Sequence, residues 1–176
     1  MLEVECDLPD IYLQPGEVCL ARRPAIIRTI LGSCVGVTFW CARLSTGALC
    51  HALLPRPPKN AANGLTLEEG YRYVDFAVRD LARQFETIGA LRQEVEVKLF
   101  GGADVLPLSA TGSSRPTVGR QNCEAAIVVV RDEGFNVIAS SLGGNCGRSI
   151  HFHTGTGEVR LRWLSHAAFE EGADGS

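Results

Sequence analysis

The chain has 176 residues, 45% of them hydrophobic and 21% charged, which is typical of a soluble, single-domain globular protein. Its net charge of −3, without a cluster of lysine and arginine, argues against a nucleic-acid-binding surface. No apolar run in the sequence is long enough to span a membrane, and the first ten residues lack the basic region of a signal peptide, so we expect a cytoplasmic protein that does not insert into membranes.

The first third of the chain is predicted to form short β-strands separated by turns. β-Branched and aromatic residues dominate these stretches, and glycine and proline separate them. Strands are expected at residues 11–13, 17–21, 25–30, 35–42 and 48–54. Turns are expected at 14–16, 31–34 and 45–47, and the proline-rich segment 55–64 is expected to be a loop.

The clearest helix is predicted from Leu67 to Ile88. Thr66 and Glu69 fit a capping box, in which the hydroxyl and the carboxylate each bond a free backbone N–H. Apolar residues recur at helical spacing, and Gly89 suits the position after a helix end. A second helix is expected from about Asn122 to Arg131.

The rest of the chain is predicted to add strands at 94–100, 135–141, 149–153 and 158–164. The glycine pairs at 101–102 and 143–144 indicate tight turns or close backbone contacts, and Gly155-x-Gly157 indicates a hairpin turn. Two helices among many strands predict the α+β class (a mixed α/β arrangement). We expect a single domain over residues 1–165, with mixed β-sheets and helices packed on the outside, and a frayed tail over residues 166–176.

The cysteine content restricts the possible chemistry. The chain has seven cysteines, and an odd number excludes a closed set of disulfides. In a reducing cytoplasm these thiols are expected to be free. The sequence has no C-x-x-C pair, so structural zinc is poorly supported.

Cys34 follows Gly32 and Ser33 and precedes a β-prone run. The residues alone leave two interpretations open. Cys34 is a small buried residue at a strand start, or it is a nucleophile presented by a sharp turn whose backbone N–H groups could bind an oxyanion.

His51 is one candidate for the base that a nucleophilic cysteine needs. It lies in an apolar strand, where a lone histidine is usually a hydrogen-bonded core residue. A simple hairpin around residues 45–47 would place His51 opposite about Phe39 and away from Cys34. Spacing alone therefore does not bring Cys34 and His51 together.

The other histidines are weaker candidates for a catalytic role. His151 and His153 would share one strand face, either as two metal ligands without an evident third or, more simply, as a solvated face. His166 falls in the expected tail.

Six short elements of the sequence carry a resemblance to a known family. They are LGSCVGV at 31–37, GALCHALLP at 47–55, KLFGGADVL at 98–106, VGRQN at 118–122, LGGNCGRSIHF at 142–152 and TG at 154–155. Each alone is weak, but the ordered set resembles the CheD family, the chemoreceptor glutamine deamidases of bacterial and archaeal chemotaxis. The resemblance implies a mixed sheet with outer helices, similar to the fold of deamidating bacterial toxins.

The resemblance also implies a cysteine hydrolase that converts selected receptor glutamines to glutamate through a thioester, without a metal or organic cofactor. Cys34 matches the family nucleophile, which would act as a thiolate paired with an imidazolium, and His51 matches the general base. The family threonine shortly before the cysteine is matched by Thr29, whose hydroxyl would orient the imidazole, while Arg28 stands where some relatives carry it. Because neighbouring strand residues face opposite sides, we expect Thr29 to face the site and Arg28 to face away.

The partners implied by the resemblance are the cytoplasmic helices of chemoreceptors, as substrate, and the phosphatase CheC. Two other functions remain open at this point. A CheD-like binding module could engage CheC or a receptor without turnover. Transglutaminase-type transfer to an amine would share the same thioester.

Overall fold

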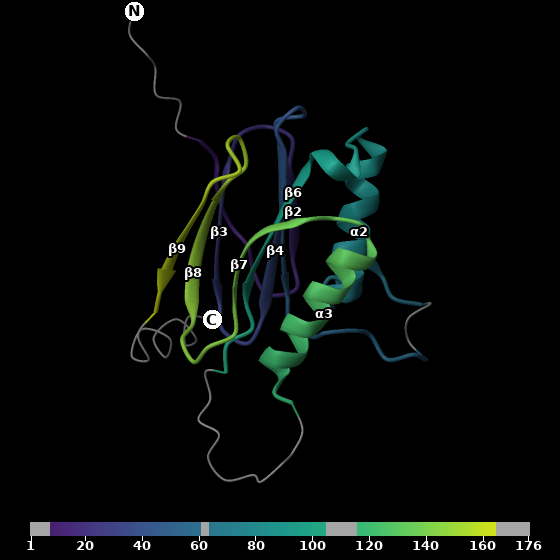
Figure 1. The fold of residues 1–176 in the computed structure, drawn as a ribbon, viewed down its shortest axis with the longest axis vertical. Helices are drawn as coiled ribbons and strands as arrows, with labels where there is room; N and C mark the ends of the chain where they lie inside the picture. The colour runs from purple at the N-terminus through teal and green to yellow at the C-terminus, as the bar shows by residue number, and fades with distance from the viewer. Residues whose placement is uncertain (1–7, 61–63, 105–115, 165–176) are drawn as a thin grey trace, which may run out of the picture.

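The computed structural model of the protein describes residues 8–60, 64–104 and 116–164, so the predicted tail at 166–176 and His166 lie outside the described residues. These residues form three layers: a four-stranded sheet, a five-stranded sheet and a layer of helices (Figure 1). In Figure 1 the strands β3, β8 and β9 lie on the left, and the helices α2 and α3 lie on the right. The predicted α+β class, with mixed sheets and outer helices, is confirmed.

The four-stranded sheet has the order β1-β3-β8-β9. Its strands are β1 (Asp10–Tyr12), β3 (Ile26–Leu31), β8 (Arg148–His153) and β9 (Val159–Trp163). The β1–β3 pair is parallel, and the other two pairs are antiparallel. The predicted hairpin between the last two strands is confirmed.

The five-stranded sheet has the order β2-β5-β4-β6-β7. Its strands are β2 (Val18–Ala21), β4 (Val35–Cys41), β5 (Thr46–Ala52), β6 (Val95–Gly101) and β7 (Val137–Leu142). Only the β6–β7 pair of this sheet, within the described residues, is parallel. The sheet occupies the middle of the three layers.

The helices are α1 (Leu67–Gly70), α2 (Val74–Thr87) and α3 (Val118–Asp132), with a short 3-10 helix, η1 (Arg92–Glu94), before β6. The predicted capping box at Thr66 and Glu69 is present. No helix of the described part of the chain is both long enough and apolar enough to cross a membrane.

Two helix predictions need correction. A continuous helix over 67–88 is wrong, because the chain between α1 and α2 pairs with the residues that follow β5: the amides of Leu53 and Leu54 both donate to the Arg72 carbonyl, at 2.9 and 3.0 Å. The second helix begins at Val118, four residues before Asn122, because the Thr117 hydroxyl caps it by accepting from the Arg120 amide.

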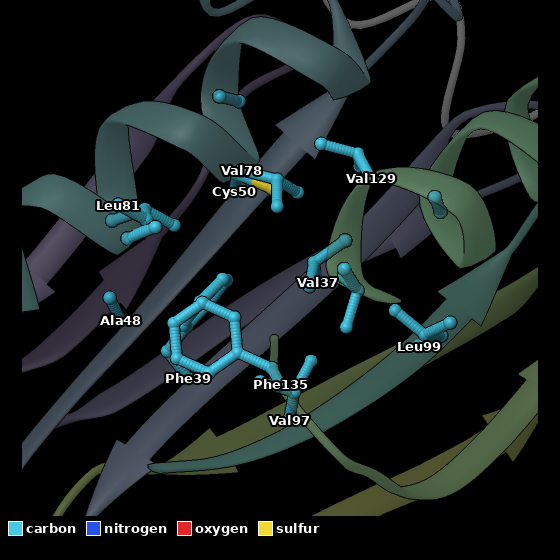
Figure 2. Packing of buried hydrophobic residues seen from close by; sticks show 14 of the residues in the cluster. Val37, Phe39, Ala48, Cys50, Val78, Leu81, Val97, Leu99, Val129 and Phe135 are labelled. Carbon is cyan, nitrogen blue, oxygen red and sulfur yellow. The ribbon is translucent and has the colours of Figure 1, made fainter. Parts of the chain in front are cut away.

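The side chains of the five-stranded sheet alternate between two apolar clusters. One cluster lies against the helices and includes Val37, Phe39, Cys50, Val78 and Val129 (Figure 2). Each fully buried side chain of this size contributes about 1.5–3 kcal/mol to the folded state. The helices are therefore attached to one face of the sheet, and the opposite face is left to pack on the other sheet.

The second cluster lies between the two sheets. It joins Leu31, Ile150 and Phe152 of the four-stranded sheet to Leu49 and Phe100 of the five-stranded sheet. We call this apolar interface between the two sheets the seam. Residues at the end of β3 and residues of β5 meet in it.

The predicted register of the β4–β5 hairpin is wrong. The turn covers Ala42–Ser45, with Ser45 in the left-handed region at φ 46°, and Thr46 and Gly47 belong to the strand. A Cβ on Gly47 would lie 2.8 Å from the Thr154 Cβ, so the glycine is needed for the close approach of Thr154 and not for the turn. The register that results pairs His51 with Gly36, not with Phe39.

Candidate active site

The Gly32–Cys34 turn links β3 of one sheet to β4 of the other, so Cys34 lies at the seam between the sheets. All three carbonyls of the turn accept a hydrogen bond from outside it. The Cys34 carbonyl accepts from the Gly102 amide at 2.7 Å, and the Gly32 carbonyl accepts from the Ala103 amide at 2.8 Å. The Ser33 carbonyl accepts from the side-chain amide of Asn122 at 2.9 Å. The turn is thus fixed from β6 on one side and from α3 on the other.

The glycine pair after β6 makes this approach possible. Gly101 and Gly102 have φ values of 100° and 66°, which favour glycine. A Cβ on Gly101 would collide with the Cys34 carbonyl, and a Cβ on Gly102 would collide with the Cys123 sulfur. The predicted close backbone contact at this pair is therefore confirmed.

His51 projects from β5 into the seam between the sheets and is 2% exposed. Its backbone is held by the turn that precedes β2, because its amide donates to the Glu17 carbonyl at 3.0 Å and its carbonyl accepts from the Gly16 amide at 2.7 Å. The paired register places His51 opposite Gly36, two residues after Cys34. The fold thus brings His51 and Cys34 to the same end of the β4–β5 hairpin.

Thr29 projects from β3 toward His51. Its Oγ1 atom lies 2.8 Å from His51 Nδ1 and 2.8 Å from the Leu13 carbonyl oxygen. The hydroxyl has one proton and the carbonyl can only accept, so Thr29 donates to Leu13 and accepts from an Nδ1–H of His51. This assigns the proton to Nδ1 and leaves the lone pair on Nε2.

Burial determines the charge of both groups. It lowers the pKa of His51 to about 4 and raises the pKa of the Cys34 thiol above its usual value. Both shifts favour a neutral imidazole and a neutral thiol in the free protein over the expected thiolate–imidazolium pair. His51 Nε2 is buried and has no hydrogen-bond partner among residues 8–60, 64–104 and 116–164.

Arg28 faces away from the site, as expected from strand alternation. Its Nε donates to an Asp10 carboxylate oxygen at 2.6 Å on the exposed face of the sheet. Thr29, the next residue, is 1% exposed and faces the seam. The expected orientation of this pair of residues is confirmed, whereas their part in a reaction stays a prediction.

His151 and His153 lie on the outward face of the four-stranded sheet, on the same side as Arg28, with which His151 is paired. His151 is exposed, and His153 Nδ1 accepts from the amides of Gly155 and Thr156, both at 3.2 Å. Within the described ranges, no three His, Cys, Asp or Glu side chains are grouped as metal ligands. The structure does not bring these two histidines to Cys34.

A hollow of about 930 Å³ lies beside the backbone that carries the site, between β1, β2 and α1. Its lining includes Leu13, Glu17, Leu53 and Tyr71. Cys34 is not among the described residues that line it. Two of its lining residues, Leu13 and Glu17, supply the backbone carbonyls that accept hydrogen bonds from Thr29 and from the His51 amide.

Two buried polar residues that support the site have no role predicted from the sequence. Asn122 contacts the Ser33 carbonyl as described. Arg148 is fully buried and donates to the carbonyls of Ser141 and Gly143, while the Gly143 amide donates to the Gly101 carbonyl at 2.9 Å. A signal existed, because both residues are polar and lie within the elements VGRQN and LGGNCGRSIHF.

Arg148 is unusual as a buried cation. Its guanidinium lies 4.7 Å from the centre of the Trp163 ring and makes no ion pair within the described residues. Burial lowers its pKa from the usual value. Backbone carbonyls and an aromatic face therefore take the place of a carboxylate partner.

The family model and the curated relatives agree on one family. The family model described as CheD chemotactic sensory transduction matches residues 53–163. The protein named probable chemoreceptor glutamine deamidase CheD 2 of Geobacter sulfurreducens is 41% identical, covering 90% of this chain and 92% of that protein. The probable chemoreceptor glutamine deamidase CheD of Oleidesulfovibrio alaskensis is 37% identical, covering 93% and 77%. A crystal structure of the hypothetical protein YfiH of Bacillus licheniformis matches 71% of this chain and 50% of that chain, with 13% identity and a TM-score of 0.43.

Proposed function

The chain belongs to the CheD family, and we propose that it is a cysteine-dependent hydrolase that deamidates selected glutamine side chains of chemoreceptors. The relatives are named as chemoreceptor glutamine deamidases, which supports this substrate class. The observation that carries the proposal is the 2.8 Å contact between Thr29 and His51 beside the Cys34 turn. It supports a triad of Cys34 as nucleophile, His51 as base and Thr29 as the residue that orients the imidazole.

In the first half of the proposed reaction, His51 Nε2 takes the thiol proton as Cys34 Sγ attacks the side-chain carbonyl carbon of a receptor glutamine. Backbone N–H groups of the Gly32–Cys34 turn stabilise the oxyanion that forms. Collapse of this intermediate breaks the carbon–nitrogen bond. His51 returns the proton to the nitrogen, so ammonia leaves and a thioester remains.

In the second half, a water molecule attacks the thioester carbon while His51 Nε2 takes one of its protons. The carbon–sulfur bond breaks, the proton returns to sulfur, and the receptor side chain leaves as glutamate. The neutral resting state of Cys34 and His51 suits this sequence, because Nε2 must be unprotonated to accept a proton at the start. Transfer to an amine would follow if an amine replaced the water.

The proposed setting is the cytoplasm, where the receptor helices are the substrate and CheC is a candidate partner. A non-catalytic binding module is the alternative, and turnover distinguishes the two. Transfer to an amine is distinguished by adding a primary amine and looking for adducts on the receptor.

The test is mass spectrometry of a purified chemoreceptor cytoplasmic fragment after incubation with the protein. We expect glutamine-to-glutamate conversion with the wild type and a loss of at least about 10³-fold with Cys34→Ser, because a hydroxyl is a far weaker nucleophile at this site. Cys41→Ala is the matched control, since Cys41 is a buried cysteine at the opposite end of β4. Binding of the fragment without any conversion by the wild type would support the binding module instead.

A further inference from the structure

Asn122 is a fully buried polar residue in a helix that otherwise buries small apolar side chains. It lies in the second turn of α3, and the buried face of that helix continues with Ala125, Ala126 and Val129. A buried amide is costly unless its hydrogen bonds are made. Asn122 Nδ2 has partners, whereas Oδ1 is buried without one among the described residues, so the cost is offset only on the donor side. The position therefore has a specific use for an amide group.

The amide bridges two backbone segments at the open end of a β-ladder. Asn122 Nδ2 donates to the carbonyls of Ser33 and Leu53, both at 2.9 Å. The β4–β5 pairing stops one step earlier, at Val35 and Ala52. The two N–H groups of Nδ2 satisfy both carbonyls, so the side chain takes the place of the ladder where the strands separate.

The two bridged carbonyls flank the proposed catalytic residues. Ser33 directly precedes Cys34, and Leu53 follows His51 by two residues. Asn122 thus ties the turn of the proposed nucleophile to the strand of the proposed base. Asn122 belongs to α3, so it contacts both segments from the helix layer and is part of neither.

The bond to Ser33 also orients the backbone amide of Cys34. The Ser33 carbonyl and the Cys34 N–H belong to one planar trans peptide and point in opposite directions. The hydrogen bond that holds the Ser33 carbonyl oxygen therefore also fixes the direction of the Cys34 N–H. That N–H lowers the pKa of the Cys34 thiol, against the larger effect of burial, and it is one of the proposed oxyanion donors.

We propose that Asn122 is a positioning residue for the deamidation reaction: its carboxamide fixes the Ser33–Cys34 peptide and holds the nucleophile turn at a set distance from the His51 strand. This inference rests on the proposed function. Asn122 touches no reacting atom in it and acts through Cys34.

The first arm of the test measures kcat and KM for deamidation of the receptor fragment. Asn122→Ala removes both donors, and Asn122→Leu removes them while filling the space. We expect either variant to lower kcat by about 10- to 100-fold and to leave KM within about threefold, since misplacing a reacting group slows chemistry more than binding. Thr46→Val is the matched control, because it removes a buried hydroxyl bond to the Leu44 carbonyl at the far end of the same hairpin. It should keep kcat within about threefold of wild type.

The second arm needs no substrate. The rate of Cys34 alkylation by iodoacetamide is followed against pH by peptide mapping. If the Cys34 N–H is no longer held in its orientation, the thiolate loses a hydrogen-bond donor. The midpoint of the alkylation rate against pH should then move to higher pH, and the alkylation rate at pH 7 should fall by about threefold to tenfold in the Asn122 variants. Neither change is expected in Thr46→Val.

An inactive wild type would overturn the proposed deamidase and would leave the alkylation arm to decide on Asn122. Unchanged kcat and an unchanged alkylation midpoint in folded Asn122 variants would overturn the positioning role. Equal losses in Thr46→Val would do the same. If neither Asn122 variant folds, the residue is required by the fold and the proposal is also wrong.

Discussion

Thr29 Oγ1 and His51 Nδ1 lie 2.8 Å apart although the two residues belong to different sheets, Thr29 to β3 and His51 to β5. The same hydroxyl binds the Leu13 carbonyl, so its one proton is already used. The contact therefore fixes both the orientation and the tautomer of His51. It is a hydrogen bond to a neutral ring and not an ion pair.

The first prediction concerns this hydroxyl. Thr29→Val keeps the shape of the side chain but removes the acceptor for Nδ1–H, so the imidazole loses its fixed tautomer. We expect deamidation to slow by about 10²-fold or more, as for orienting residues in other triads. Thr29→Ser keeps the hydroxyl and should retain most of the activity. The measurement is the kcat for receptor deamidation.

Arg28→Ala serves as the neighbouring control for Thr29. Arg28 is bound to Asp10 on the exposed face, so its loss should change kcat little. A damaging Arg28→Ala with a harmless Thr29→Val would contradict the assignment and would favour a weakened or purely binding member of the family.

The second prediction concerns the pH dependence of the reaction. His51 acts as a base only when it is neutral, and its pKa is about 4 in the folded protein. The kcat/KM value at pH 5 should therefore be at least about half of the value at pH 7. An ordinary histidine with a pKa near 6.5 would leave roughly 3% of the base neutral at pH 5. A loss of activity between pH 7 and pH 6 would show that His51 is not the base or is not buried as described.

The third prediction concerns stability. The pKa of His51 is about 4 when folded, below the ordinary value of 6.5, so between these values the unfolded chain binds the proton more readily than the folded one. Stability is fully present above pH 6.5 and is lost as the pH falls toward 4. The free energy of unfolding should lose about 3 kcal/mol from this group over that range.

Urea unfolding at pH 7, 5.5 and 4.5 measures this loss. His51→Gln is the reference, because glutamine does not titrate and all other groups are shared. The difference between wild type and variant should shrink as the pH falls. A constant difference would rule out a buried, neutral His51.

The fourth prediction uses two glycines with similar backbone conformations. Gly89 has φ 84° and open space where a Cβ would lie, whereas a Cβ on Gly101 at φ 100° would collide with the Cys34 carbonyl. Gly89→Ala should cost about 1–2 kcal/mol of unfolding free energy for the left-handed conformation alone. Gly101→Ala should cost about 1–3 kcal/mol more and should reduce deamidation, because Cys34 must move. Equal stability losses and intact activity in both variants would contradict the tight support of the turn.

The fifth prediction concerns the outward histidines. The double variant His151→Ala/His153→Ala should keep kcat near wild type, because neither residue lies on the seam side of β8. His51→Ala should lower kcat by orders of magnitude and retain the circular dichroism spectrum of the fold. An inactive double variant with an active His51→Ala would reverse the assignment of the base.

The strands and the capping box could be read from the sequence because their signals are local. Alternating β-branched residues place β4, and Thr66 with Glu69 places the start of α1. The register of the β4–β5 hairpin could not be read this way. Gly47 looks like a turn residue, but a glycine is needed there because any side chain would collide with Thr154, which lies more than a hundred residues away in the sequence.

The candidate site shows the same division. Cys34, His51 and Thr29 could be named from their motifs, and strand alternation gave the direction of Thr29. The VGRQN element marks Asn122 as a residue of interest, but its contacts to Ser33 and Leu53 could not be predicted, because they depend on how α3 packs on the sheet. The neutral state of the thiol and the imidazole also depends on burial, which no short motif encodes.

The position of Cys34 in the crossover between two sheets makes the site dependent on how those sheets dock. Each sheet could keep its own hydrogen-bonded ladder if water entered the apolar seam around Leu49 and Phe152. The far-ultraviolet circular dichroism would then persist, while the distance between Thr29 and His51 would grow and turnover would stop. Enzymatic activity would thus report on the packing of the two sheets, and it would be lost at a lower denaturant concentration than the far-ultraviolet circular dichroism signal of the strands.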